Sequence, residues 1–171
     1  IATGNHVFSL NEDDAVPEPE AVLELPGIRC VAEGRAFGLV TRDVGEGILL
    51  RQKAEPERLS VQVGEPVESL LPPGNAEGTI LFGTEGAHLY TVDPAEGAQP
   101  ERIPAFDELD CRSEWNTPWG GPPAVRSLAR STDGWIYADI HVGSIMRSPD
   151  GGVSWEPVTP DLNRDVHQVA A

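Results

Sequence analysis

The sequence predicts an all-β protein, and three observations lead to this fold class. Glycine and proline are abundant, with 18 Gly and 16 Pro in 171 residues, which suits many short strands and turns. No stretch keeps the period of about 3.6 residues that marks an amphipathic helix. A unit of several short strand-like segments recurs along the chain. Together they predict a β-propeller of four-stranded antiparallel blades, an incomplete ring with about three complete blades and partial ones.

The first strand of each unit gives the clearest repeat. Residues 28–32, 67–71, 125–129 and 166–170 read Ile-Arg-Cys-Val-Ala, Val-Glu-Ser-Leu-Leu, Val-Arg-Ser-Leu-Ala and Val-His-Gln-Val-Ala. Their starts lie 39, 58 and 41 residues apart. Two of these spacings are close to the ~40–45 residues of a four-stranded propeller blade. The spacing of 58 residues indicates an insertion, which we place at residues 105–124.

The strands that follow each first strand recur as well. Second strands are predicted at 37–41, 79–83 and 135–139, third strands at 47–51, 88–92 and 144–147, and fourth strands at 58–63, 101–104 and 156–158. Turn-forming residue pairs stand at the joins between these segments. Two further strands, at 4–10 and 21–25, precede the first complete unit and are separated by an acidic loop with two prolines.

We expect a single β-propeller domain, or part of one, over residues 1–171. A partial blade covers 1–27, complete blades cover about 28–66, 67–124 and 125–165, and residues 166–171 start the next blade. An open ring leaves strand edges that can pair with other chains. We therefore expect either further chain beyond Ala171 or self-association of two copies to close the ring.

The turn between the predicted strands 144–147 and 156–158 carries the most specific motif of the chain. Ser148, Asp150, Gly152, Ser154 and Trp155 match the pattern Ser/Thr-x-Asp-x-Gly-x-Ser/Thr-Trp. The segment resembles the Asp-box of BNR-repeat β-propellers, and the chain is similar to sialidase-like and photosystem-assembly-factor-like propellers, including bacterial ones. This resemblance implies a structural role for the five residues, whose oxygens bond to the turn and whose indole packs over it. It indicates a fold far better than a function.

Charge and composition exclude some partners. The formal net charge of −16 repels the phosphates of nucleic acid, so no nucleic acid is expected as a partner. No run approaches the ~20 apolar residues of a membrane span, so no membrane insertion is expected. The chain is expected to be soluble, but its location remains open between cytoplasmic and secreted. Cys30 and Cys111 can pair or can stay as free thiols, and therefore do not decide the compartment.

Strand polarity predicts where a ligand would bind. If all first strands run in one direction, the loops that lead into them share a face with the loops between second and third strands, at the mouth of the central channel. That face collects residues of the insertion, of the loop near residue 140, and of the second position of each first strand. These candidate ligand-binding residues are Trp115, Asn116, Trp119, Asp139, His141, Arg29, Glu68, Arg126 and His167.

The same residues also admit structural roles. The charged or titratable residues at the second positions can pair with one another across the channel. Trp115 and Trp119 can either plug the core or form a stacking platform for a sugar or another flat ligand. His141, His167 and Asp165 are candidates for metal ligands, but they lack the tight ligand spacing of a typical site. We therefore expect no metal, and we expect no cofactor.

Two classes of function fit the sequence. We expect a ligand-binding or scaffolding propeller that uses the channel-mouth face for a glycan, a peptide or a protein. The alternative is a sialidase-like glycoside hydrolase or lyase, with carboxylates as acid and base. We favour binding over catalysis because the sequence defines no catalytic carboxylate pair. Arg102-Ile103-Pro104 matches a sialidase motif, but it falls in a predicted outer strand, so we take the match as coincidental.

Overall fold

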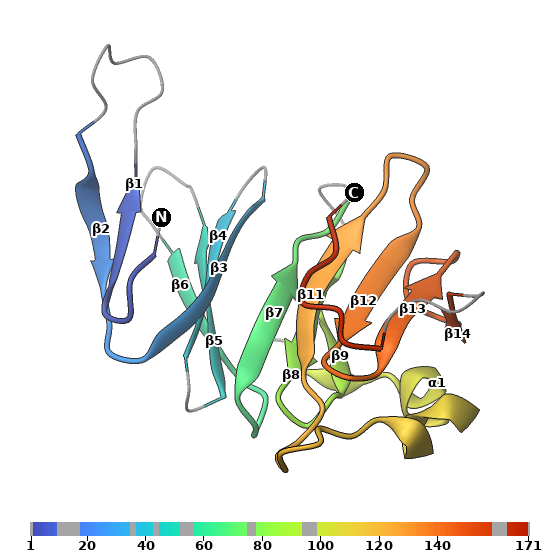
Figure 1. The fold of residues 1–171 in the computed structure, drawn as a ribbon. Coiled ribbons are helices and arrows are strands. Elements are labelled where there is room, and N and C mark those ends of the chain that lie inside the picture. Colours follow the sequence, from blue (N-terminus) through green and yellow to red (C-terminus); the bar gives the residue numbers. More distant parts are fainter. Residues whose placement is uncertain are drawn as a thin grey trace.

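The computed structural model describes residues 2–9, 18–34, 37–42, 45–51, 57–74, 78–93, 99–158 and 164–170 (Figure 1). The described chain is almost entirely β-structure. In chain order its elements are β1 (His6–Ser9), β2 (Glu20–Glu24), β3 (Ile28–Gly34), β4 (Phe37–Arg42), β5 (Glu46–Arg51), β6 (Glu57–Gln62), β7 (Val67–Leu71), β8 (Ile80–Thr84), β9 (Leu89–Val92), β10 (Glu101–Arg102), α1 (Pro104–Asp107), the 3₁₀ turn η1 (Asp110–Glu114), β11 (Val125–Arg130), β12 (Ile136–Ile140), β13 (Ser144–Ser148) and β14 (Glu156–Pro157).

Three four-stranded antiparallel sheets make up most of the fold. In each sheet the strands are neighbours in chain order, as β3-β4-β5-β6, β7-β8-β9-β10 and β11-β12-β13-β14. Strands β1 and β2 form a separate antiparallel pair. Four strands that meander in sequence order and repeat along the chain are propeller blades, and the protein is an incomplete β-propeller. The predicted strands are confirmed to within a few residues, with two exceptions.

The first strands of the sheets lie side by side, because β3 contacts β7 and β7 contacts β11 (Figure 1). Their third residues link each strand to the next. The hydroxyl of Ser69 donates to the carbonyl oxygen of Val125 over 2.8 Å. The hydroxyl oxygen of Ser127 accepts the backbone N–H of Val169 over 2.8 Å. Cys30 holds the equivalent position in β3, with its thiol against the backbone of β7. The same repeat position thus bonds to the next first strand at Ser69 and to the segment 166–170 at Ser127.

The predicted first strand at residues 166–170 is the first exception, because the structure has no strand there. The segment does run beside β11, and Asp165 forms an isolated bridge with His141. The backbone N–H of Val169 donates to the side-chain hydroxyl of Ser127 in β11 rather than to a backbone carbonyl. A β-ladder needs repeated backbone-to-backbone bonds, so this contact does not define a strand.

The second exception is the predicted strand at 101–104, which ends at Arg102. Pro104 begins the short helix α1, because its fixed φ suits the first turn of a helix and it has no N–H to place in a ladder. The helix buries Phe106 completely. The Phe106 ring packs edge-on against Trp155 at 5.1 Å between centroids and against Trp115 at 5.6 Å. The insertion is therefore anchored to the last sheet by aromatic contacts.

Hydrophobic cores lie between neighbouring sheets. The core between β3–β6 and β7–β10 contains Val61, Val63, Val67, Leu70, Ile80, Phe82 and Val92. The core that joins β7–β10, the insertion and β11–β14 contains Leu71, Leu81, Ala87, Leu89, Ile103, Phe106, Trp115, Val125, Ile136, Ala138, Ile140, Met146 and Trp155. The middle sheet therefore packs on both of its faces. This explains why β8 is buried at every position.

The turn after β13 is held by side-chain oxygens. The Asp150 carboxylate accepts the backbone N–H of Ser154 over 2.8 Å and its hydroxyl over 2.6 Å. The hydroxyl oxygen of Ser148 accepts the N–H of Gly152 over 2.8 Å. The Trp155 indole N–H donates to the carbonyl of Gly152 over 2.9 Å, which folds the ring over the turn. Gly152 has a φ of 102°, a conformation that side chains disfavour.

These bonds make the turn sensitive to acid. Donors from Ser154, Ser148 and Val153 stabilise the charged carboxylate and lower the pKa of Asp150 to about 2. Because its folded pKa lies below the ordinary value of 3.8, Asp150 stabilises the fold above about pH 4 and loses this effect as the pH falls toward 2. Asp150→Asn is expected to lower Tm at neutral pH, and the difference from the parent should shrink as the pH falls from 4 to 2.

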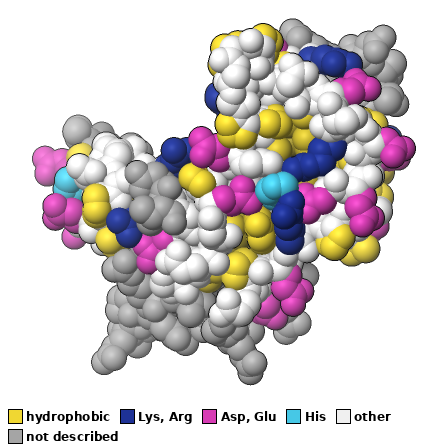
Figure 2. Space-filling view, turned by 90° about the horizontal axis from the view of Figure 1, so that it is seen from below, with side chains coloured by type: hydrophobic (Ala, Val, Ile, Leu, Met, Phe, Trp, Pro, Cys, Tyr) yellow, Lys and Arg dark blue, Asp and Glu magenta, His cyan; other side chains and the backbone are white. Residues whose placement is uncertain are grey.

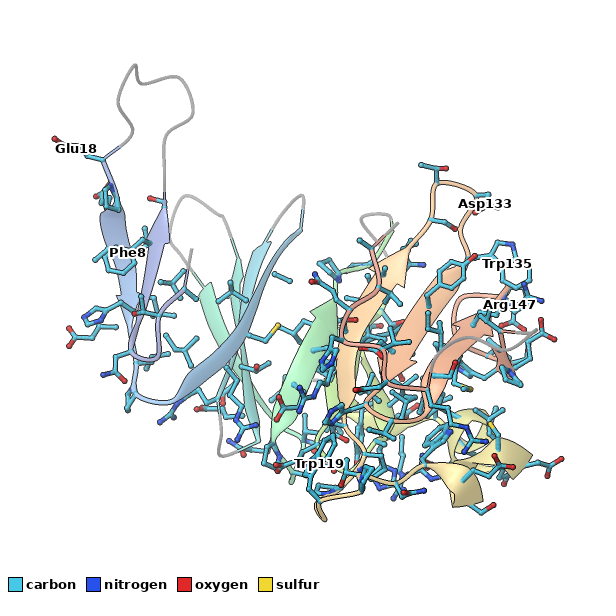
Figure 3. All side chains as sticks on the ribbon, viewed as in Figure 1. Phe8, Glu18, Trp119, Asp133, Trp135 and Arg147 are labelled. Carbon is cyan, nitrogen blue, oxygen red and sulfur yellow. The ribbon has the colours of Figure 1, made fainter. Side chains whose placement is uncertain are left out.

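Thermal unfolding of both chains across this pH range measures the difference. Asp133→Asn is the matched control, since Asp133 also lies in a hairpin turn and accepts a bond from the hydroxyl of Ser131 (Figure 3). Its effect on Tm should be smaller, because the backbone N–H groups of Val153 and Ser154 donate to Asp150, whereas none within the described ranges donates to Asp133. A Tm difference for Asp150→Asn that stays constant from pH 6 to pH 2 would contradict the role given to this carboxylate.

Two further sequence questions are answered within the described chain. None of its helices has the length and hydrophobicity that a membrane span requires. Cys30 and Cys111 are free thiols. Burial raises the pKa of both thiols. A raised pKa reduces the thiolate fraction, so neither cysteine has the character of an activated nucleophile.

Candidate functional site

The loops that connect successive sheets and the loops that connect second to third strands gather at the bottom of Figure 1, on a face that we call the lower face. It is formed by residues 63–66, 84–88, 103–124 and 141–143. Figure 2 views the molecule from this side, where acidic and basic side chains surround a histidine and hydrophobic side chains lie between them. Of the channel-mouth residues predicted from the sequence, Trp115, Asn116, Trp119 and His141 lie in these segments. Arg29, Glu68, Arg126 and Asp139 lie in the adjoining strands, and His167 lies in the segment after residue 164.

A row of three rings crosses this face, and we call it the aromatic row (Trp119, His141 and His167). The Trp119 ring lies 5.4 Å from the His141 ring between centroids, and the His141 ring lies 5.9 Å from that of His167. Trp119 is 66% exposed, at the bottom of Figure 3, whereas His141 is buried. The rings come from the insertion, the β12–β13 loop and the segment after residue 164. The structure therefore brings together three residues that are distant in sequence.

The backbone around His141 holds its imidazole in place. The N–H of His141 donates to the carbonyl of Ala124 over 2.9 Å, which ties the loop to the end of the insertion. Val142 adopts a φ of 58°, a conformation that is costly for a β-branched residue. A Cβ on Gly143 would lie 2.9 Å from Cδ1 of Trp115, so the loop passes too close to the indole for any larger residue. The position of His141 is thus set by backbone contacts on both sides.

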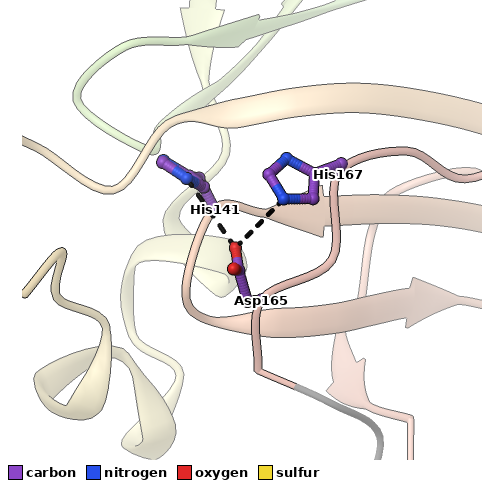
Figure 4. A group of neighbouring side chains, drawn as sticks. All are labelled: His141, Asp165 and His167. Carbon is purple, nitrogen blue, oxygen red and sulfur yellow. Dashed lines mark ion pairs between the residues drawn. The ribbon is translucent and has the colours of Figure 1, made fainter.

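Asp165 lies between the two histidines of the row (Figure 4). Its Oδ1 is 3.5 Å from Nε2 of His167 and 3.9 Å from Nε2 of His141. Asp165 and His167 are exposed, and His141 is not. Burial lowers the pKa of His141, and the positive charge of Arg126 lowers it further. A neutral imidazole offers a nitrogen lone pair to a ligand or cation.

Asp139 is buried with no exposed surface, at the end of β12 and two residues before His141. Neither of its carboxylate oxygens has a hydrogen-bond partner among the described residues. Burial raises the pKa of Asp139 to about 6, although the charges of His167 and Arg126 and the nearby hydroxyl of Ser127 act to lower it. A buried carboxyl is costly, and such groups are frequent at functional sites.

The second residues of the first strands share a local distortion. The ladder register shifts at Arg29 in β3, at Glu68 in β7 and at Arg126 in β11. A bulge leaves one residue unpaired and re-aims its side chain. Arg29 and Glu68 form an ion pair between neighbouring sheets, as the structural reading of these residues expected. Arg126 acts instead on the electrostatics of Asp139 and His141. Among the second-position residues, Arg29 and Glu68 therefore form a salt bridge, whereas Arg126 belongs to the cluster around Asp139 and His141.

The two tryptophans of the insertion have different roles. Trp115 is only 7% exposed and packs against Phe106, with the Arg112 guanidinium 5.0 Å from the ring centroid. We therefore remove Trp115 from the candidate surface, because a buried indole cannot stack on a ligand. The side-chain amide of Asn116 donates to the carbonyl of Glu114 over 2.9 Å and thereby stabilises the loop. Trp119 alone retains an open ring face.

A second polar cluster on this face was missed at the sequence level. The Asp107 carboxylate forms an ion pair with Nε of Arg102 over 2.5 Å and lies 2.9 Å from Nδ1 of His88. Arg112 adds its guanidinium beside this imidazole and donates to the carbonyl of Ala87 over 2.6 Å. The only sequence signal was Arg102, within Arg102-Ile103-Pro104. The other members could not be found because the turn of α1 brings them together.

The fold defines a class of protein, an incomplete β-propeller with four-stranded blades. Comparison with known proteins adds little detail. No protein-family model matches the chain, and no curated protein matches it. Among solved structures, the chain is similar to one described as "YCF48 bound to D1 peptide", with 18% identity and a TM-score of 0.49. The match covers 87% of this chain and 45% of that one, so the chain spans less than half of its structural neighbour.

Proposed function

We propose that the chain is a ligand-binding propeller that takes a peptide or a segment of a protein on its lower face. The observation that carries this proposal is the exposed indole of Trp119, which stands against the buried ring of His141. A large apolar ring held rigidly at the surface is an effective anchor for a partner chain, because little conformational entropy is lost on binding. His167 and Arg126 add polar groups around His141.

Two features favour a peptide or a protein over a free sugar. Small ligands prefer enclosed pockets. Trp119 is 66% exposed rather than enclosed, which suits an extended partner better than a small ligand. The side-chain amide of Asn116, a group well suited to sugar hydroxyls, already donates to the carbonyl of Glu114.

The glycosidase alternative receives less support from this site. A glycosidase needs two carboxyl groups that both reach the scissile bond. Asp165 is exposed, but Asp139 has no exposed surface and could not protonate a bound sugar without rearrangement. Arg102 is engaged with Asp107 in the outermost strand of its sheet, so it is not free to hold a substrate carboxylate. We therefore place binding ahead of hydrolysis.

We also propose a finer family assignment, the BNR-type Asp-box propellers. The bonds of Asp150, Ser148 and Trp155 support it, because each has the role that the Asp-box resemblance implies. The same proposal divides the chain into blades at about residues 28–66, 67–124 and 125–165. The sheets β3–β6, β7–β10 and β11–β14 support this division. Under this assignment the Asp-box serves the fold and not the ligand.

Selection of binding peptides tests the proposed function. A displayed library of random dodecapeptides is selected on the immobilised chain, and the affinities of enriched peptides are measured by interferometry. Trp119→Ala should weaken binding by about 10-fold or more, as expected for an aromatic anchor. Val153→Ala is the matched control, since Val153 is 74% exposed but lies in the turn after β13. It should leave the affinities unchanged.

Two outcomes would contradict the proposal. One is that enriched peptides bind the parent and the Trp119→Ala chain equally well, which would place the binding surface elsewhere. The other is that no peptide is enriched while a glycan array gives ligands that depend on Trp119, which would identify a carbohydrate-binding propeller. Turnover of a panel of chromogenic glycosides, lost in Asp165→Asn, would instead support the hydrolase alternative.

A further inference from the structure

We infer that His141, Asp165 and His167 form a binding site for a divalent transition-metal ion, with Zn²⁺ as the best-suited ion. This site goes beyond the proposed peptide binding and does not depend on it. Sequence spacing disfavours a metal site, because residue 141 is separated from residues 165 and 167 by most of a blade. The structure removes this objection by placing the three side chains together (Figure 4).

The geometry of the three donors is close to that of a metal site. One ligand atom from each residue lies within 4.8 Å of the other two. Asp165 Oδ1 is 3.5 Å from Nε2 of His167 and 3.9 Å from Nε2 of His141. Bonds of about 2.0–2.2 Å in tetrahedral Zn²⁺ sites place ligand atoms roughly 3.3–3.5 Å apart. To bind one ion, the ligand atoms of Asp165 and His167 need to move toward Nε2 of His141 by less than the length of one such bond.

Burial gives the site one fixed ligand and two adjustable ones. His141 is held by its contact with the Trp119 ring and by the backbone bond to Ala124. Asp165 and His167 are exposed and can close on an ion without disturbing the core. Three protein ligands leave a position for water or for a group of a bound partner. Two imidazoles and one carboxylate form a donor set that suits Zn²⁺, Co²⁺ or Ni²⁺ better than Ca²⁺ or Mg²⁺.

The buried carboxyl of Asp139 favours positive charge beside the cluster. It has no exposed surface and lies in β12, two residues before His141. A buried carboxylate is costly unless positive charge compensates it. His167 and Arg126 supply part of that charge, and a metal ion held by His141 would add to it.

One neighbouring charge opposes the ion. Arg126 lies close enough to act on Asp139 and on His141. Its positive charge repels a cation, whereas the net charge of −16 on the chain attracts one. Removing the guanidinium should therefore tighten metal binding. This gives the experiment a variant that improves the site as well as variants that destroy it.

Titration of the metal-free chain with ZnCl₂ tests the inference, in a Cys30→Ala/Cys111→Ala background that removes both thiols as ligands. Isothermal calorimetry should show one Zn²⁺ per chain, and Zn²⁺ should raise Tm. His167→Asn and Asp165→Asn each should weaken binding by at least about 10-fold. Both residues are exposed, so these variants should fold. His6→Asn is the matched control, since His6 pairs with Glu24 far from the cluster.

A second measurement reports on the ligands directly. Co²⁺ bound in place of Zn²⁺ should give the visible absorption of a low-coordinate nitrogen and oxygen site, and this absorption should vanish in the His167→Asn/Asp165→Asn double variant. Arg126→Gln should increase the Zn²⁺ affinity. Binding that is absent in the parent, or that is retained in the double variant, would overturn the inference. Loss of peptide binding in Trp119→Ala, with Zn²⁺ binding retained, would leave both proposals standing as separate properties.

Discussion

Phe106→Ala is expected to lower the free energy of unfolding by about 3–5 kcal/mol, the largest effect of any substitution considered for this chain. Phe106 has no exposed surface and contacts both Trp115 and Trp155, so its ring joins the insertion to the last sheet. Removing the ring leaves a cavity between rigid aromatic neighbours that cannot collapse to fill it. A loss of this size is a large part of the roughly 5–15 kcal/mol that stabilises a typical domain.

Denaturation in urea, followed by tryptophan fluorescence, measures the change. Phe8→Ala is the matched control, because it removes the same side chain from a position in β1 that is only partly buried. Its effect should be clearly smaller than that of Phe106→Ala. If the two substitutions cost the same, Phe106 would not be the link between the insertion and the sheet. If the free energy of unfolding of Phe106→Ala depends less steeply on urea concentration than that of the parent, the insertion unfolds separately from the sheets.

Gly83→Ala is expected to destabilise the protein by about 1–3 kcal/mol, although alanine normally stabilises a strand relative to glycine by about 0.5–1 kcal/mol. A Cβ on Gly83 would lie 2.6 Å from Cγ1 and 2.8 Å from Cβ of Val125, and it would also meet the hydroxyl of Ser69. Val125 is fully buried in β11 and cannot move aside. The clash should therefore exceed the propensity gain.

The same denaturation experiment measures this effect against Gly4→Ala. A Cβ on Gly4 would meet nothing within 4 Å, so that substitution should be neutral or slightly stabilising. Because Ser69 donates to the carbonyl of Val125, Gly83→Ala should also disturb the bond between β7 and β11. A stability equal to or above that of the parent would show that the sheets can separate at this point, contrary to the packing described for the first strands.

The repeat was predictable because local sequence features define it. Turn residues and short apolar runs mark the strands, and their order is set by the chain itself. The third position of the first strands also repeats as Cys30, Ser69 and Ser127, small residues that fit between adjacent strands. Segment 166–170 has the same pattern but no strand, because sequence similarity does not supply the backbone partners that a ladder needs.

The candidate site was predictable only in outline. Strand polarity placed Trp119, His141 and His167 on one face, and the rings do stand in a row. Burial could not be predicted, because it depends on contacts made by distant segments. The sequence does not distinguish the buried Trp115 from the exposed Trp119, which lie in the same loop. The approach of Asp165 to both histidines likewise depends on the path of the chain after residue 164.

The position of the cores between sheets has a consequence for how the molecule can come apart. Among the described residues, each core is shared by two neighbouring sheets, and the insertion adds Phe106 and Trp115 to one of them. Stability in such an array is shared between nearest neighbours, as in linear repeat proteins. The smallest cooperative unit is therefore a pair of adjacent sheets. The middle sheet belongs to both pairs, so its loss would expose both cores to water at once.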